Sequence, residues 1–199
     1  MKTKLQKHDI DWKLAKNMCR TTVNKGHSDI EATSKFKLSL LISEHSPIRE
    51  LKIRWSWLKI KSWIATHFAR HRWESYISTR RTDRTGVDRD KLLQSERVQM
   101  DCSANAQHLI DTSRKRLCHQ ASPETRGYWE DLKLSIYDEG HEELFMVMVP
   151  NCVYRAGCPE FADCGHYSRL IGKDKGVTST DIRIRYKAYN KVFLEAHDA

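Results

Sequence analysis

The sequence predicts an α/β protein of the α+β type, with a central mixed or antiparallel sheet flanked by helices. The first observation is the alternation of apolar and polar residues over 51–57, which is the two-residue period of a half-buried strand. The second is the helical spacing of apolar residues on both sides of that segment. The third is size, because 199 residues with 39% hydrophobic residues suffice for one domain with a core.

Two helices are predicted upstream of the strand. Over residues 11–20 the apolar side chains share one helical face, and Asp11 is placed to act as the N-cap. Residues 30–43 show the same spacing. This second helix should end before Pro47, because the residue preceding a proline avoids helical geometry.

One more helix and a long loop are predicted in the middle of the chain. After the strand, residues 59–69 return to helical spacing and lead into a run of basic residues. The polar segment 75–103 is expected to be an ordered loop with a short helix near 91–98.

Two helices and two short strands are predicted in the second half. Residues 104–119 are strongly amphipathic, and Ser122 followed by proline and glutamate has the composition of a helix start. The apolar run 145–149 is predicted to be a short strand. Residues 182–187 alternate apolar and basic side chains, which predicts a terminal strand.

The chain is expected to form one main domain over residues 1–150. A Cys-rich extension over 151–199, with the terminal strand, is expected to pack on that domain. No apolar run approaches the roughly 18 residues that cross a membrane. No apolar segment follows the first charged residues either, so we expect a cytoplasmic protein without a membrane partner.

The charge of the chain favours an anionic partner. The formal net charge is +9 at pH 7 with His neutral, which attracts nucleotides, phosphorylated cofactors or nucleic acid. The densest basic cluster lies within residues 67–86, where five arginines are interleaved with hydroxyl side chains. Guanidinium groups bind phosphate through paired hydrogen bonds, so this segment is a candidate anion site. The alternative is a solvated basic surface.

Two motifs within this part of the chain carry a family resemblance. The segment RHRWES at 70–75 resembles the RHRxxS signature of flavin-dependent thymidylate synthases, and a Ser-Pro pair at 46–47, a strand and a helix precede it in the family's order. A second block opens with NAQ at 105–107 and has Arg116 near the end of its helix. The resemblance covers residues 12–136 in consistent order, which is more specific than either motif alone.

The resemblance implies an FAD-dependent reductive methylation of dUMP to dTMP. Methylenetetrahydrofolate would supply the carbon, NADPH would supply the hydride, and the enzyme would be a homotetramer. In this family an arginine, not a protein nucleophile, activates the pyrimidine by stabilising its ionised edge, and by position this catalytic arginine is Arg116. A phosphate-binding or surface role is the alternative for Arg116, because Arg114 and Lys115 stand beside it.

Two sets of binding residues are also implied by the resemblance. The residues expected to contact FAD are His45, Ser46, Arg70, His71, Arg72, Asn105 and Asp111. The residues expected to contact dUMP are His67, Arg70, Ser78, Arg80, Arg81 and Arg116. The family's additional substrate arginine has two possible counterparts here, Arg89 and Arg97.

The chain departs from the family pattern directly after the signature. An Asn-Glu pair is expected there, but residues 70–83 read RHRWESYISTRRTD. This departure gives weight to a variant with the same fold that transfers another one-carbon group, such as hydroxymethyl, to a pyrimidine nucleotide. An alternative from another class is a non-enzymatic nucleic-acid-binding protein that uses the same arginines, the basic strand 182–187 and a zinc-stapled C-terminus. The two ordered motifs favour the enzyme.

The cysteines suggest a metal site. All six are expected to be reduced thiols in a protein without a secretory segment. Cys152, Cys158 and Cys164 are spaced by six residues and His166 follows, and three thiolates with one imidazole can hold a structural zinc ion in tetrahedral geometry. This spacing is wider than in the usual zinc knuckle, so buried thiols that pack as small hydrophobes are the alternative.

Cys118 and His119 form a possible competing pair of ligands. Their position directly after Arg116 favours packing at the active site instead.

Overall fold

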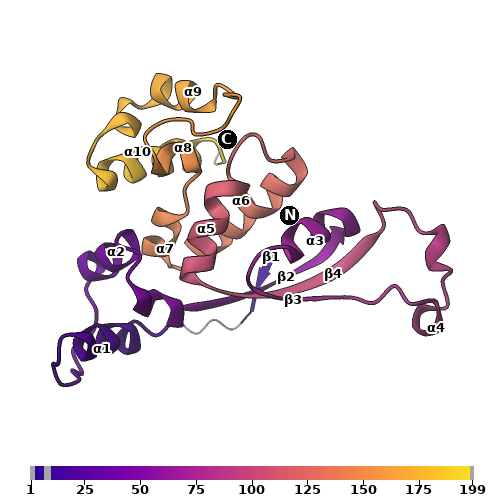
Figure 1. Cartoon of the computed structure of the whole chain (residues 1–199), viewed down its shortest axis with the longest axis horizontal. Helices are drawn as coiled ribbons and strands as arrows, with labels where there is room; N and C mark the ends of the chain where they lie inside the picture. The colour runs from indigo at the N-terminus through magenta and orange to yellow at the C-terminus, as the bar shows by residue number, and fades with distance from the viewer. Residues whose placement is uncertain (1–2, 7–9, 198–199) are drawn as a thin grey trace.

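The computed structural model describes residues 3–6 and 10–197. Its central sheet has four antiparallel strands in the order β1-β2-β4-β3. Figure 1 shows the sheet at one side of the molecule, helices α5 and α6 above it, and the C-terminal helices beyond them. The predicted α+β class with an antiparallel sheet is therefore confirmed.

Strand β2 (Lys52–Lys61) confirms the strand predicted from alternation. Ile53, Trp55 and Trp57 are completely buried, whereas the residues between them point to the other face. The register shifts between Trp57 and Ile60, where a bulge ends the strict alternation. The chain then enters α3 (Ser62–Ala69), which confirms the helix predicted over 59–69 with a start three residues later, and its buried side packs on the sheet.

The long loop predicted for residues 75–103 is wrong. This segment contains β3 (Glu74–Ile77) and most of β4 (Arg97–Asn105), and β4 buries every second residue from Val98 to Ala104. Five of the nine β4 residues are polar and alternate strictly with Val98, Met100, Cys102 and Ala104, so the two-residue period of a strand was present in the sequence and was missed within a long polar segment. Pairing with β2 on one side and β3 on the other stabilises it.

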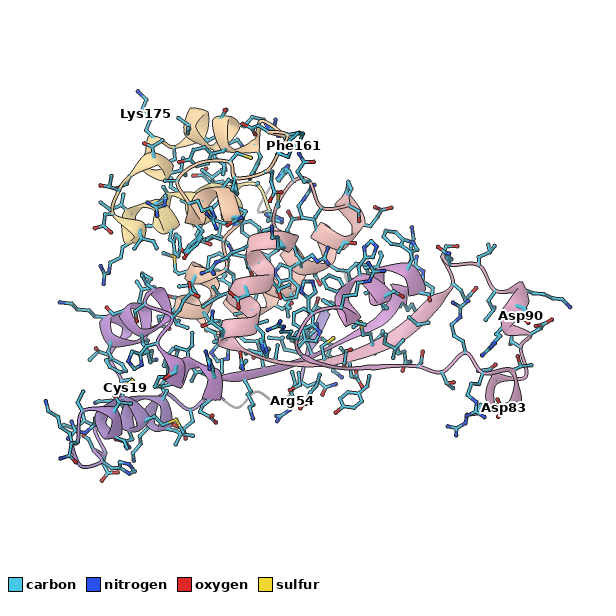
Figure 2. All side chains as sticks on the ribbon, in the orientation of Figure 1. Cys19, Arg54, Asp83, Asp90, Phe161 and Lys175 are labelled. Atoms are coloured by element: carbon cyan, nitrogen blue, oxygen red, sulfur yellow. The ribbon has the colours of Figure 1, made fainter. Side chains whose placement is uncertain are left out.

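Between β3 and β4 the chain makes an extended excursion away from the body, which we call the arm (residues 78–96). It contains only α4 (Thr82–Thr85) and the short helix η2 (Arg89–Lys91). The helix predicted near 91–98 is wrong: η2 ends at Lys91, and Arg97 and Val98 begin β4. Figures 1 and 2 show the arm projecting to one side, with Asp83 and Asp90 labelled on it.

The core lies between the sheet and the helices α5 (Ala106–Arg116) and α6 (Pro123–Asp138). Four large rings form its centre: Trp73 stacks on Trp129 with ring centroids 5.3 Å apart, and both contact Trp55 and Phe68. Ser122 caps α6 as predicted, because its Oγ accepts a hydrogen bond from the Thr125 backbone N–H.

The N-terminal strand and helices close one end of the sheet. Strand β1 (Thr3–Leu5) pairs with β2. Helix α1 (Trp12–Thr22) is capped by Asp11, as the sequence predicts. Helix α2 (Ser34–Ile42) is capped by Thr33 and is followed by the short helix η1 (Ser46–Glu50), so the second predicted helix also exists with a later start.

Both strands predicted in the second half of the chain are wrong. The apolar run 145–149 belongs largely to α7 (Glu142–Val147), because a short apolar run does not distinguish a strand from a buried helix. Residues 182–187 open α10 (Ile182–Glu195), which Asp181 caps. The apolar residues further along α10 follow helical spacing, and this longer pattern overrides the local alternation.

The segment after residue 150 contains α8 (Asn151–Tyr154), α9 (His166–Lys173), η3 (Lys175–Thr178) and α10. Arg185 is buried and donates from Nε to the carbonyl of Val153 at 2.7 Å and from Nη2 to that of Tyr154 at 3.1 Å. The basic strand that the nucleic-acid alternative required is therefore a helix, and one of its cations is buried and engaged in binding the backbone. No helix of the described residues has the length and apolarity to cross a membrane.

Candidate functional site

The site begins where α3 ends. Helix α3 stops at Ala69 and the next three residues, Arg70, His71 and Arg72, lead towards β3. Arg70 and Arg72 are exposed, whereas His71 between them is half-buried and packs its ring on Trp73, with centroids 5.0 Å apart. The sequence signature therefore places one imidazole inwards and two guanidiniums outwards on either side of it.

Arg116, the last residue of α5, meets this turn from the opposite side. Its Nε donates to His71 Nε2 at 2.9 Å, and its Nη2 donates to the carbonyl oxygen of His67 at 3.1 Å. These contacts link the C-terminal ends of α3 and α5. Nη1 of Arg116 has no hydrogen-bond partner among the described residues, so it remains available for a ligand.

The electrostatics of the turn favour a neutral imidazole beside a cationic arginine. Burial, with the Arg116 charge as a second cause, lowers the pKa of His71 to about 4. A guanidinium can only donate, so Nε2 of His71 must accept and its proton must reside on Nδ1. Burial and then the charge of Arg70 lower the pKa of Arg116, which nevertheless remains charged at neutral pH.

Two surface hollows flank the turn. The first, the α3 hollow, is lined by Ser62, Trp63, Thr66, His67, Arg70 and Gln94 and has a volume of about 320 Å³. The second, the sheet hollow, is lined by Lys52, Arg54, Arg72, Trp73, Glu74, Ser103, Ala104, Asn105 and His108 and has a volume of about 410 Å³. The signature thus contributes Arg70 to one hollow and Arg72 to the other.

His67 is the further signature-related side chain in the α3 hollow. Its Nδ1 lies 3.4 Å from Thr125 Oγ1, and its ring meets Trp63 edge to face. Burial, then the charges of Arg116 and Arg70, lower the pKa of His67. This side chain is therefore a neutral hydrogen-bonding group beside two cations.

Arg116 differs from its two basic neighbours in its partners. Arg114 pairs with Glu44 and with Asp111, and Lys115 pairs with Glu160 at 3.6 Å. Arg116 contacts a neutral imidazole and a carbonyl, and no carboxylate within the described residues. Of these three consecutive cations, Arg116 is therefore the one suited to bind an anion.

Arg70 and Arg72 are likewise unpaired with a carboxylate in the described part of the chain. Three arginines thus lie at this turn without an acidic partner: Arg116, which contacts His71, and Arg70 and Arg72, which flank His71 in the sequence. Such a group is electrostatically unfavourable unless an anion binds among the cations.

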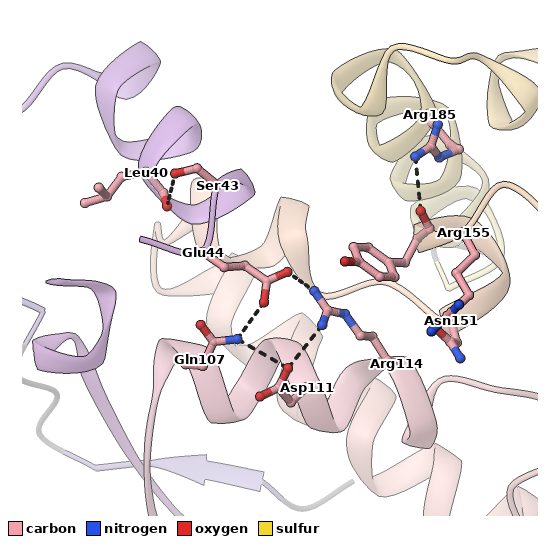
Figure 3. A network of polar contacts seen from close by, with 10 residues as sticks. Leu40, Ser43, Glu44, Gln107, Asp111, Arg114, Asn151, Arg155 and Arg185 are labelled. Carbon is pink, nitrogen blue, oxygen red and sulfur yellow. Dashed lines mark hydrogen bonds and ion pairs between the residues drawn. The ribbon is translucent and has the colours of Figure 1, made fainter. Parts of the chain in front are cut away.

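Figure 3 shows how the structure uses Asp111. Its Oδ1 accepts from Gln107 Nε2 at 3.3 Å and from Arg114 Nη1 at 3.2 Å, and Gln107 also donates to Glu44 Oε2 at 2.6 Å. Arg114 stacks on the Tyr154 ring, 3.8 Å from its centroid. This network joins α5 to the end of α2 and to α8, so Asp111 lies within a set of polar contacts that fixes the helices.

The remaining residues expected to bind FAD lie in two places. Asn105 caps α5 by accepting from the His108 backbone N–H at 3.0 Å, and it lines the sheet hollow with Arg72. His45 and Ser46 are exposed at the start of η1, directly after Glu44 of the network. Arg72 and Asn105 thus line the same hollow, whereas His45, Ser46 and Asp111 line neither of the two hollows.

The residues expected to bind the nucleotide phosphate lie on the arm or at its base, and their polar groups contact other parts of the chain. Ser78 Oγ accepts from the Gln99 backbone N–H at 3.1 Å. Arg80 donates to Ser62 Oγ at 2.9 Å and to the Leu93 carbonyl at 3.1 Å, while Arg81 pairs with Asp83 at 2.7 Å. Arg80 thus links the arm to the edge of the α3 hollow.

The two candidates for the additional substrate arginine have different surroundings. Arg89 is exposed on the arm and lies 3.8 Å from Asp90, whereas Arg97 begins β4 and donates to the Lys59 carbonyl at 2.7 Å. Neither lines the α3 hollow.

The cysteines are free thiols, as expected. Among the described residues, no group of three or more His, Cys, Asp or Glu side chains stands as a formed metal site. The imidazole of His166 stacks on that of His119, with ring centroids 3.6 Å apart.

The depressed pKa of His71 predicts a pH dependence of stability. Above pH 6.5 the imidazole is neutral in both the folded and the unfolded chain, so the stability is fully present. As the pH falls from 6.5 towards about 4, the unfolded chain takes up the proton first and stability is lost. We expect the melting temperature of His71→Gln, which keeps a hydrogen-bond acceptor, to fall less over this pH range than that of the wild type.

The matched control for this prediction is His45→Gln, because His45 is exposed. Thermal unfolding recorded from pH 7 to pH 4 would check it. An equal loss in the wild type and in His71→Gln would contradict a neutral, buried His71.

The fold and the site together define a class of protein: an α+β protein in which the ends of two helices meet at a turn whose arginines have no carboxylate partner among the described residues. Its fold is that of known enzymes. The chain matches flavin-dependent thymidylate synthase ThyX from Helicobacter pylori, complexed with FAD and dUMP, with a TM-score of 0.61 and 13% identity over 75% of this chain and 100% of that chain.

A second structure of Thymidylate Synthase X from Helicobacter pylori with FAD and dUMP gives a TM-score of 0.61 at 14% identity, over 74% of this chain and 99% of that chain. The UMP/dUMP methylase PolB from Streptomyces cacaoi, bound with 5-Br dUMP, gives a TM-score of 0.57 at 12% identity, over 74% of this chain and 96% of that chain. No family model and no curated protein sequence matches the chain. The protein therefore has the fold of the flavin-dependent thymidylate synthases, as the resemblance implied.

Proposed function

We propose that this protein is a flavin-dependent enzyme that methylates dUMP at C5 to form dTMP, with methylenetetrahydrofolate as carbon donor and NADPH as reductant. The observation that carries the proposal is the contact of Arg116 with a neutral His71, which Arg70 and Arg72 flank, with no carboxylate partner for these three arginines among the described residues. The fold supports it, because solved structures with this fold include enzymes complexed with FAD and dUMP.

The α3 hollow is the proposed nucleotide site. Arg70 supplies positive charge and His67 supplies a neutral hydrogen-bonding group at its wall. Arg116 does not line the hollow itself but contacts the carbonyl of His67, which does, and its two hydrogen bonds fix the direction of the guanidinium with Nη1 left free. A fixed guanidinium beside the N3–C4–O4 edge of the pyrimidine would stabilise negative charge there and make C5 more nucleophilic.

The sheet hollow is the proposed flavin site, and its residues fit such a group. Lys52, Arg72 and His108 line it beside the amide of Asn105, a donor set that suits the pyrophosphate of a dinucleotide. When bound, FAD would accept a hydride from NADPH and deliver it to the transferred carbon. The protein's own contribution is to hold the phosphates and to align the nucleotide, because the two hollows share the turn at residues 70–72.

His71 has a positioning role in this proposal. It accepts the hydrogen bond of Arg116 Nε and, being neutral, does not neutralise the guanidinium as a carboxylate would. The full charge of Arg116 is then available to the substrate.

The proposed enzyme is a homotetramer. Tyr76 and Ile77 are large apolar side chains exposed on the edge strand β3, which supports association through this part of the sheet. Light scattering during size-exclusion chromatography measures the mass, and a monomer at micromolar concentration would contradict the tetramer.

The flavin and nucleotide assignments are tested by separate variants. We expect the purified protein to show flavin absorbance and to oxidise NADPH in a dUMP-dependent manner in the presence of methylenetetrahydrofolate. Arg72→Ala should weaken FAD binding, whereas Arg70→Ala should mainly raise the dUMP concentration needed for half-maximal rate. Arg84→Ala is the matched control, because Arg84 is exposed on the arm and outside both hollows.

Two outcomes would count against the proposal. A colourless protein that does not bind added FAD would remove the flavin chemistry. Equal effects of all three arginine variants would mean that the cations act only through overall charge. Mass spectrometry of the product distinguishes a methyl from a hydroxymethyl group.

A further inference from the structure

A small closed hollow lies between the α5–α6 connection and the segment that follows α8. Four of the six cysteines line it: Cys118, Cys152, Cys158 and Cys164. Its volume is about 10 Å³, which is room for one small species and not for an organic ligand. Three of these thiols belong to the cysteines that are spaced by six residues in the sequence. The fourth belongs to Cys118, which follows the end of α5 more than thirty positions earlier in the chain.

The four thiols lie on three segments that meet at this hollow: the connection after α5, helix α8 and the loop that follows α8. Cys152 is buried, and Cys118, Cys158 and Cys164 are half-buried, so all four are partly shielded from solvent.

The segment from Arg155 to Gly165 is the second observation. It contains no helix or strand, and Phe161, its one large apolar side chain, is completely exposed. The contacts that hold it are few and polar: Gln120 Nε2 donates to the Ala162 carbonyl at 2.6 Å, and Lys115 pairs with Glu160 at 3.6 Å. Such a loop has too little apolar burial to offset its ordering entropy.

We propose that Cys118, Cys152, Cys158 and Cys164 bind one structural Zn²⁺ ion that fastens this loop to the end of α5. Four sulfur donors select zinc over hard cations such as magnesium or calcium. Binding would release four protons, one from each thiol, and give a complex with a net charge of −2. Arg169, whose Nη1 donates to the Cys164 carbonyl at 3.2 Å, provides a nearby compensating charge.

The side chains in this structure do not form a coordination shell, so the thiols must rotate inwards around the ion. This set also differs from the one expected from sequence, in which His166 was the fourth ligand. The imidazole of His166 borders the hollow but stacks on His119. Cys118 supplies a sulfur from the other wall, and it lies two residues after Arg116, so the ion would also fix the last turn of α5.

The metal content of the purified full-length protein tests the proposal. Protein expressed with added zinc and purified without chelator should contain about one zinc per chain by elemental analysis. Replacing zinc by Co²⁺ should give the ligand-field absorption of a tetrahedral thiolate site. Neither measurement depends on flavin or on dUMP, so a failure of this proposal is distinct from a failure of the proposed reaction.

Variants identify the ligands. Cys118→Ser, Cys152→Ser, Cys158→Ser and Cys164→Ser should each lose the zinc, whereas Cys19→Ser in α1 and His166→Gln should keep it. Loss of zinc in His166→Gln with retention in Cys118→Ser would replace the proposed ligand set by the one expected from sequence. Where a variant does not fold, Co²⁺ titration of the metal-free wild type still reports the site.

Three outcomes would overturn the proposal. One is a zinc-replete preparation that contains no metal and shows no cobalt spectrum. Another is bound iron in place of zinc. The third is a protein whose mass is lower by pairs of hydrogens, which would show that the thiols pair as disulfides.

Discussion

Arg116→Ala is expected to lower the dUMP-dependent turnover of the proposed enzyme by about 10²–10³-fold while leaving FAD bound. The guanidinium is fixed by His71 and by the His67 carbonyl, so it needs no reorganisation as negative charge develops on the pyrimidine. It lines neither hollow, but it contacts the carbonyl of His67, a residue of the α3 hollow and not of the sheet hollow proposed for the flavin, which is why the flavin should stay. Steady-state NADPH oxidation and the flavin absorbance of the same preparation measure the two effects.

The adjacent residue provides the control for Arg116. Lys115→Ala removes a cation one position away that is exposed and paired with Glu160. It should retain turnover close to the wild-type value. Arg116→Lys should remain strongly impaired, because an ammonium group cannot keep both hydrogen bonds and present a third donor in the same plane. Loss of flavin together with activity in Arg116→Ala would contradict a role confined to the nucleotide.

Lys133→Ala is expected to destabilise the protein by about 3–5 kcal/mol. Lys133 lies on α6 and is completely buried. Its Nζ donates to Asn190 Oδ1 at 2.6 Å and to the Met148 carbonyl at 2.7 Å, within 5 Å of the ring centroids of three aromatic side chains, Phe145, Tyr189 and Phe193. Alanine would leave both oxygens without this donor and would open a cavity between α6 and α10.

Urea unfolding followed by circular dichroism measures this loss. Lys133→Met fills more of the volume but supplies no donor, so its loss should be smaller than that of Lys133→Ala and still clear. Lys187→Ala is the control, because Lys187 is exposed on α10, and it should stay within about 0.5 kcal/mol of the wild type. A comparably small effect of Lys133→Ala would mean that the C-terminal helix does not depend on this contact.

The sequence contains a signal for the burial of Lys133. It lies four residues after Trp129 and three before Ile136, which are both apolar and share the buried side of α6. A charged residue at such a position is buried with partners or distorts the helix. Its partners are Asn190 on α10 and the carbonyl of Met148 at the end of α7. The strand wrongly predicted over 182–187 left no helix that could supply the first of them.

For the site, the sequence indicated the residue types and their order but not which cations stay free. The sequence does not show which of Arg114, Lys115 and Arg116 is free to bind an anion. It does not distinguish Arg80 and Arg81 from Arg70 in this respect either. The structure separates them through their partners, because Glu44, Glu160 and Asp83 each neutralise one neighbour. Long-range pairings of this kind depend on how helices pack, and no local pattern encodes them.

Local patterns by themselves determined the N-caps of α1 and α6, the strand β2 and the turn that bears Arg70, His71 and Arg72, since capping and two-residue alternation depend on nearest neighbours along the chain. Tertiary packing decided that β4 lies inside the sheet, between β2 and β3. It also decided that Cys118 joins three distant thiols and that Arg116 contacts His71. Such contacts join residues far apart in sequence, and they are stable only when burial of the whole core offsets the loss of chain entropy.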